Sequence, residues 1–265
     1  MIAYFAGIFL SMFDEKIGTG KTVVELNASD EGWIYLIQYL LFLITFGIWY
    51  RYLLQREEKN KLRLRHSKPQ TADQKRTAAK WDPLRYWAKR LPFLIILGYT
   101  LQLCATGILS AMSNGFPKAF ESYKELINSL AGSGVDIKTF ISVSFIAPMA
   151  EELMFRGVSY HYACKALSVK WGILFQAVLF GIYHGNLIQF LYAVPLGMLF
   201  GALRKQSGSV VPGIVLHIII NLSAYLIPSG WIDTVPKAAL MTGLSALLII
   251  PACIILFKKP EKRDE

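Results

Sequence analysis

The chain has 265 residues, of which 54% are hydrophobic and 17% charged, and its mean hydropathy is +0.40. This composition excludes a disordered chain, which has fewer apolar residues, and a soluble domain, which carries roughly 25% charged residues. The formal net charge of +10 leaves two classes open: a nucleic-acid binder with a basic patch, and a membrane protein with basic loops on one side.

Apolar segments along the chain predict a membrane protein. Residues 1–13 are short for a span, and we interpret them as a marginal first span or a helix lying on the surface. Residues 33–54 and 92–112 each reach the roughly 20 apolar residues that cross a bilayer. Further segments follow at 138–155, 171–184, 187–203, 210–227 and 237–257. The predicted fold is all-α, a polytopic membrane helical bundle of about eight transmembrane or membrane-embedded helices.

The positive charge is concentrated in the loop 51–91, which has 13 Lys or Arg residues against 4 Asp or Glu residues. The positive-inside rule predicts that this loop is cytoplasmic, and counting spans onward brings the basic tail to the same side. Asp82 and Pro83 predict either a helix on the surface of anionic lipid or an ordinary basic flank of the next span. Because the loop accounts for the excess charge, no nucleic-acid partner is expected.

Charged residues inside an apolar segment are costly and indicate function. Glu151 and Glu152 lie side by side in FIAPMAEELMFRG, and Arg156 follows. On a helix Arg156 neighbours Glu152, while Glu151 is turned about 100° away and can interact with other groups. The alternative is a salt-bridged helix end at the membrane interface.

Two of the four histidines also fall inside predicted spans. His184 lies one helical turn after Phe180, and His217 lies one turn before Asn221. Taken singly, His184 could be a satisfied core residue, and His217 with Asn221 could join two helices. Because these residues occur together with the glutamates, one functional site is a better explanation than three unrelated structural roles.

These residue types are sufficient for hydrolysis by water. A carboxylate can act as general base, a histidine can position or deprotonate the water, and a His/Asn pair can donate hydrogen bonds to a tetrahedral oxyanion. No serine or cysteine nucleophile is indicated, and the three scattered cysteines contain no CxxC pair.

Three ordered motifs carry a resemblance to a known family. EELMFR from Glu151 to Arg156, FGIYH from Phe180 to His184, and HIIIN from His217 to Asn221 resemble the EExxxR, FxxxH and HxxxN motifs of the CPBP family. That family comprises the CaaX-processing and bacteriocin-processing intramembrane proteases, also called Abi proteins. The resemblance divides the chain into N-terminal membrane segments (1–137), a catalytic core (138–227), and a final span with a basic tail (228–265).

The resemblance implies a role for each motif residue. Glu151 would activate water with help from His184, and His217 with Asn221 would form the oxyanion hole. Glu152 and Arg156 would hold the site together, with Phe180 beside them. A metal-free glutamic mechanism without a cofactor is expected. The alternative is a zinc enzyme with Glu151, His184 and His217 as ligands, although no HExxH motif is present.

The predicted function is therefore an intramembrane endopeptidase whose partner is a peptide or protein substrate at the membrane. Two alternatives remain: a non-catalytic scaffold or regulator of other membrane proteins, and a transporter that uses Glu and His as a proton relay. The four residues Glu151, His184, His217 and Asn221 are expected to converge in one cavity. A span ending at residue 155 creates a difficulty, because it places Glu151 near the inner surface and His184 about 20 Å deep.

Overall fold

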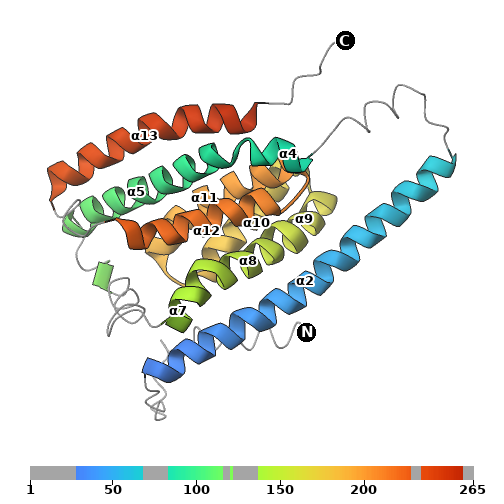
Figure 1. The fold of residues 1–265 in the computed structure, drawn as a ribbon, viewed down its shortest axis with the longest axis horizontal. Coiled ribbons are helices and arrows are strands. Elements are labelled where there is room, and N and C mark those ends of the chain that lie inside the picture. Colours follow the sequence, from blue (N-terminus) through green and yellow to red (C-terminus); the bar gives the residue numbers. More distant parts are fainter. Residues whose placement is uncertain (1–27, 68–82, 116–119, 122–136, 228–233, 259–265) are drawn as a thin grey trace.

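The computed structural model describes residues 28–67, 83–115, 120–121, 137–227 and 234–258, and within these ranges every regular element is helical. The predicted all-α polytopic bundle is confirmed (Figure 1). The predicted segment at 1–13 lies outside the described residues. The helices are α2 (Ala28–Ser67), α4 (Pro83–Ala88), α5 (Leu91–Gly115), α7 (Ile137–Ile141), η2 (Ser142–Ile146), α8 (Ala147–Glu152), η3 (Leu153–Ser159), α9 (Tyr160–Ala166), α10 (Val169–Tyr183), α11 (Leu187–Ser207), α12 (Val211–Leu226) and α13 (Val235–Phe257).

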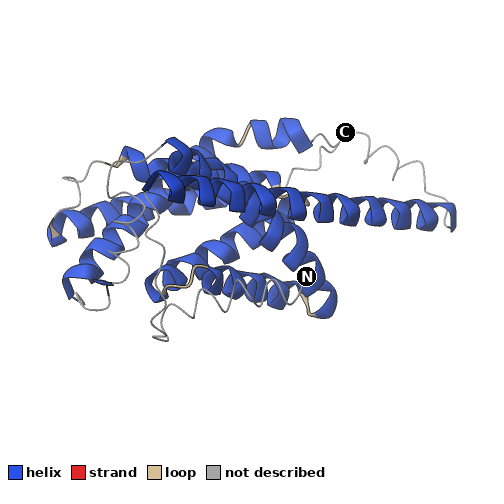
Figure 2. Cartoon of the chain, turned by 90° about the horizontal axis from the view of Figure 1, so that it is seen from below, coloured by secondary structure: helices blue, strands red, loops and turns tan. Residues whose placement is uncertain are grey.

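The helices lie side by side in successive layers (Figure 1). α13 packs against α5, α5 against α12, and α10 against α11. The continuous run from α7 to α9 packs against this group on one side and against α2 on the other. α2 is long enough that its C-terminal part extends past the other helices, as the view from below also shows (Figure 2). The core between the layers contains buried apolar side chains from most helices, among them Phe46, Leu97, Phe155, Phe180, Phe200, Leu216 and Leu256.

The outer surface of the bundle is apolar, as a lipid-facing surface should be. On the two outermost helices, Ile48 of α2 is 67% exposed and Leu247 of α13 is 68% exposed. Four segments are long and apolar enough to cross a membrane, and α10 and α12 are shorter apolar helices. The four segments are Tyr35–Asn60, Leu91–Ser113, Leu187–Ser207 and Pro236–Phe257. The chain is therefore a multi-pass membrane protein.

The turn between α10 and α11 is defined by three residues. His184 is the C-cap residue of α10, and Gly185 follows with a φ of +65°, a left-handed conformation that glycine adopts without strain. The side-chain oxygen of Asn186 then accepts hydrogen bonds from the backbone N–H groups of Ile188 and Gln189 at 2.9 and 3.3 Å, which caps α11. These turn residues place His184 at the end of α10.

The helix that carries the glutamates is longer than the sequence predicts. It runs without interruption from Ile137 to Ala166 and contains two π-helical segments, η2 and η3, on either side of α8. The predicted end at residue 155 is wrong because Tyr162 packs against Trp49 of α2, with ring centroids 6.1 Å apart, and the helix continues for about three more turns.

Because the helix is longer than predicted, Glu151 and His184 no longer lie at different depths in the membrane. Glu151 now lies about 20 Å along its helix from Ala166, and His184 lies about 20 Å along α10 from Val169. Because α9 connects directly to α10 at those ends and the two helices pack together, both side chains are at a similar level of the bundle.

Helix ends near the basic segments of the sequence lie together at one end of the bundle (Figure 1). Contacts join α2 with α9, α11 with α9, α11 with α13, and α4 with the end of α13. The contacting pairs are Glu57 with His161 (3.0 Å), Arg204 with the Tyr160 ring (5.7 Å), Gln206 with the Leu256 carbonyl (2.8 Å) and Tyr86 with the Lys258 carbonyl (2.8 Å).

Candidate active site

The two adjacent glutamates end α8, and Arg156 follows in η3. Glu151 is 6% exposed, and Glu152 and Arg156 are each 0% exposed. Nη1 of Arg156 lies 2.9 Å from Oε1 of Glu152, so the ion pair expected from the spacing is formed. Because a buried charge without a partner costs several kcal/mol, each member of this pair depends on the other. The ion pair does not include Glu151, whose Oε2 lies 3.7 Å from Nε2 of His217.

Three phenylalanine rings surround the guanidinium group. The Cζ atom of Arg156 lies 4.3 Å from the ring centroid of Phe180, 4.8 Å from that of Phe200 and 5.8 Å from that of Phe155. Such contacts favour a desolvated cation over an aromatic face. The rings also hold the planar group in place, which fixes the partner Glu152 as well.

Two glycines on neighbouring helices make room for the ion pair. A Cβ atom at Gly213 of α12 would lie 2.6 Å from Oε2 of Glu152. A Cβ atom at Gly197 of α11 would lie 3.2 Å from Nη2 of Arg156 and 2.9 Å from the backbone of Ala177. Both glycines therefore allow close approach of helices around the charged pair.

The imidazole of His217 lies between the two carboxylates. Its Nδ1 is 3.4 Å from Oε1 of Glu152 and its Nε2 is 3.7 Å from Oε2 of Glu151. Both distances exceed those of an ordinary hydrogen bond, so the contacts are electrostatic in this state. The ring stacks on Phe200 at 5.0 Å between centroids, which fixes its plane. His217 thus links the paired glutamate with the unpaired one.

His184 reaches the same cluster from the end of α10. Its ring lies edge to face with Phe180 at 4.7 Å, and Phe180 in turn contacts His217 at 5.8 Å. Its Nδ1 lies 2.7 Å from the Phe180 carbonyl oxygen. Since a carbonyl oxygen only accepts, Nδ1 carries the proton and Nε2 is left as an acceptor.

Asn221 lies one turn beyond His217 on α12. Its Nδ2 donates a hydrogen bond of 2.8 Å to the backbone carbonyl of Val143 in η2. The amide has two N–H groups, so one remains for another acceptor. The contact also joins α12 to the helix that carries the glutamates.

A zinc ion would need several of these side chains to converge on one point. Among the residues that the structure describes, no three His, Cys, Asp or Glu side chains are arranged to hold a metal ion together. The candidate set of Glu151, His184 and His217 therefore does not form a preorganised metal site.

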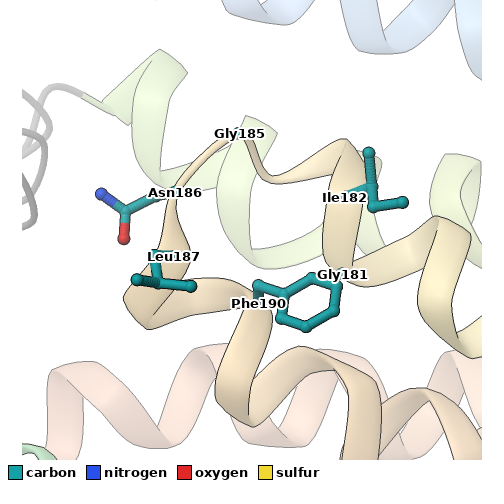
Figure 3. A pocket seen from close by; sticks show the side chains of 6 residues that line it. All are labelled: Gly181, Ile182, Gly185, Asn186, Leu187 and Phe190. Carbon is teal, nitrogen blue, oxygen red and sulfur yellow. The ribbon is translucent and has the colours of Figure 1, made fainter.

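An open cavity of about 210 Å³ lies at the turn between α10 and α11 (Figure 3). Its lining residues are Gly181, Ile182, Gly185, Asn186, Leu187 and Phe190. None of the four residues expected to share a cavity lines this one. It borders the turn from Ile182 to Leu187, which includes His184.

Sequence reasoning missed several residues that build the site. Gln176 is fully buried in α10, and its side-chain nitrogen donates to the carbonyl of Gly197 at 2.8 Å, which joins α10 to α11 beside Arg156. A glutamine in an otherwise apolar span is a signal that the sequence does contain. Gly197 and Gly213 offer no such signal, because glycines are common in membrane helices.

The fold and these buried groups define a multi-pass membrane protein with a polar site inside its helical bundle. A family model described as type II CAAX prenyl endopeptidase Rce1-like matches residues 134–223. This match confirms the resemblance of the three motifs to the CPBP family of CAAX-type intramembrane proteases, over residues 134–223. No curated protein and no solved structure matches the chain.

Proposed function

We propose that this protein is an intramembrane endopeptidase in which Glu151 activates water. One observation carries the proposal: Glu151 is a buried carboxylate whose Oε2 lies 3.7 Å from Nε2 of His217, while Arg156 is paired with Glu152. The His184 ring joins the same cluster through Phe180. A buried base next to histidines is the arrangement that general base catalysis requires, and such a base contributes about 10²–10⁴-fold to a rate. The match to a protease family supports the assignment.

The reaction follows from the donors and acceptors. Glu151 takes one proton from water as the oxygen attacks the peptide carbonyl carbon, and the Nε2 of His184 accepts a hydrogen bond from the same water. His217 and the second N–H of Asn221 donate to the oxyanion that forms. The carbon–nitrogen bond then breaks, and Glu151 returns its proton to the leaving amine. In this scheme Glu152 and Arg156 do no chemistry and hold His217 in position.

The proposed mechanism uses no metal or other cofactor. It rests on the chemistry of the side chains, since the cluster supplies a base, a water acceptor and oxyanion donors from its own residues. The catalytic core corresponds to residues 138–227. Residues 1–137 and 228–265 supply the surrounding membrane segments.

The substrate proposed is a peptide or protein held at the membrane. The matching family is described by its action on prenylated CAAX proteins, so a prenylated C-terminal tail is the first class to test, and leader and signalling peptides are the next. The gathered basic helix ends support a cytoplasmic position for the loop 51–91 and the C-terminal tail, where they would meet anionic lipids.

Comparative peptidomics of membranes tests this function. Cells with the wild-type chain are compared with cells carrying Glu151→Gln, which keeps the side-chain shape and removes the base. Peptides that accumulate uncut in the variant, with matching cleavage products only in the wild type, support the proposal. A cellular phenotype that survives the substitution, with no change in the peptides, would point to a scaffold instead.

A further inference from the structure

One face of α11 contacts Arg156 at both its side chain and its backbone. A Cβ atom at Gly197 would lie 3.2 Å from Nη2 of Arg156, and the ring centroid of Phe200 lies 4.8 Å from its Cζ atom. One turn further along α11, Nε of Arg204 donates a hydrogen bond of 3.2 Å to the backbone carbonyl of Arg156. Spacings of three and four residues place Gly197, Phe200 and Arg204 on the same face of a helix. This face therefore holds Arg156 from the guanidinium group to the backbone.

The carbonyl that Arg204 binds lies in the π-helical segment η3. A carbonyl oxygen has two lone pairs, so it can accept from Arg204 in addition to a helical N–H group. Because the donor is charged, this hydrogen bond is stronger than one between neutral groups. A π-helical segment departs from the 3.6-residue period, so the direction of its side chains depends on how its backbone is held. Arg204 holds that backbone at the residue whose side chain binds Glu152 at 2.9 Å.

Two tyrosine rings from other helices lie beside the Arg204 guanidinium group. Its Cζ atom is 5.7 Å from the ring centroid of Tyr160 in α9 and 5.9 Å from that of Tyr50 in α2. Both distances fall within the roughly 6 Å over which a cation is attracted to an aromatic face. Tyr50 also packs closely on η3, because a Cβ atom at Gly157 would lie 3.0 Å from its ring. Arg204 is therefore held where α2, α9, α11 and η3 meet.

Contacts continue from Arg156 to the proposed base. Nη1 of Arg156 lies 2.9 Å from Oε1 of Glu152, and the same oxygen lies 3.4 Å from Nδ1 of His217. Nε2 of His217 in turn lies 3.7 Å from Oε2 of Glu151. A shift of the backbone at Arg156 would therefore move the ion pair, and with it the imidazole that the proposed mechanism uses.

We infer that Arg204 is a positioning residue, which holds the backbone carbonyl of Arg156 so that Arg156, Glu152 and His217 keep their places beside Glu151. Arg204 lies outside the three sequence motifs and acts through Arg156 rather than on the substrate. This inference rests on the proposed function, because it assigns Arg204 a task in that reaction.

Two substitutions of nearly equal length separate the hydrogen bond from the charge. Arg204→Gln puts an amide nitrogen at the position of Nε, and Arg204→Met puts a methyl group there. Both remove the charge, and only glutamine can still donate to the carbonyl of Arg156. Lys205→Met is the matched control, because it removes the neighbouring positive charge from an exposed position.

Steady-state cleavage is measured with each full-length variant reconstituted in vesicles, using peptides that membranes of the Glu151→Gln strain leave uncut. We expect Arg204→Met to lower kcat about 10- to 100-fold with KM within about twofold, because the lost hydrogen bond positions the site and does not bind substrate. Arg204→Gln should be at least about fivefold faster than Arg204→Met, and Lys205→Met should match the wild type. The thermal midpoint of each variant distinguishes unfolding from a loss of rate.

Other outcomes separate the two claims. If Glu151→Gln still cuts every peptide, the proposed function fails and the inference fails with it. If Glu151→Gln is inactive, the inference alone is overturned by any of three results: a wild-type rate in Arg204→Met, equal rates in Arg204→Met and Arg204→Gln, or a rise in KM with unchanged kcat.

A further variant decides the case in which Arg204→Met does not fold. Arg204→Lys keeps the charge and has a carbon atom at the position of Nε. Arg204→Gln should then be faster than Arg204→Lys, because it keeps the donor at that position. A lysine variant that is as fast as the glutamine variant, or faster, overturns the inference.

Discussion

The close approach of Gly213 to Glu152 allows a sharp test of how the site is held. Replacing Gly213 by alanine adds one Cβ atom, which would lie 2.6 Å from Oε2 of Glu152, whereas ordinary contacts begin at 3.4 Å. The carboxylate must therefore move by about 0.8 Å, the difference between these two distances. It is not free to do so, because Arg156 holds its other oxygen at 2.9 Å and the side chain is fully buried.

The cost of this substitution can be separated from its helical benefit. Alanine in place of glycine favours a helix by roughly 1 kcal/mol in its interior. Gly243 lies in the interior of α13, whereas Gly213 lies in the first turn of α12, where the benefit is smaller. Overpacking a fixed site costs about 1–3 kcal/mol. At Gly243 of α13 an added Cβ atom would meet no other atom within 4 Å, so Gly243→Ala gains the helical benefit alone. The two variants should therefore differ in stability by at least the overpacking cost, about 1–3 kcal/mol.

Thermal unfolding in detergent and steady-state cleavage measure both effects. We expect Gly213→Ala to have a lower thermal midpoint than Gly243→Ala and to lose most activity, because displacement of Glu152 also displaces His217, whose Nδ1 lies 3.4 Å away. Gly243→Ala should keep the wild-type rate. Equal midpoints and equal rates for the two variants would refute the claim that Glu152 is rigidly held.

Three further predictions concern other parts of the site. Arg156→Met leaves the Glu152 charge buried without its partner and should destabilise the protein by about 3–5 kcal/mol, and adding Glu152→Gln should recover most of the thermal midpoint. If the added Glu152→Gln change does not raise the thermal midpoint, the loss of stability in Arg156→Met does not come from an unpaired Glu152 charge. Asn221→Leu removes the hydrogen bond to Val143 and the proposed oxyanion donor. The value of kcat should therefore fall about 10²–10³-fold, while the free energy of unfolding falls by only about 1 kcal/mol. A change in stability without a change in kcat would contradict the donor role. A zinc chelator should leave the rate unchanged within about twofold, and a loss that added zinc restores would replace the metal-free mechanism.

The sequence alone predicted the helical bundle and the contacts between residues one turn apart on the same helix. The ion pair of Glu152 with Arg156 follows from i,i+4 spacing on one helix, and the structure contains it. The apolar runs predicted α5, α10, α11, α12 and α13 because each such run is long, has few charges and ends near turn residues. These features depend on neighbours in the sequence.

Contacts between distant segments could not be predicted in the same way. The extension of the glutamate helix beyond residue 155 depends on Tyr162 meeting Trp49 of α2, and no local pattern in the sequence encodes that contact. The same holds for Gly213 beside Glu152. Two π-helical segments further change which side chains share a face, because the 3.6-residue period no longer applies there.

The rate of peptide cleavage by purified Glu151→Gln tests the central claim most directly. Wild type and variant are reconstituted in the same vesicles and supplied with the same membrane peptide. We predict that kcat falls by about 10²–10⁴-fold while the peptide still binds and the thermal midpoint is retained, because only the base is lost. A variant that cleaves within tenfold of the wild-type rate would contradict the assignment of Glu151 as the group that activates water.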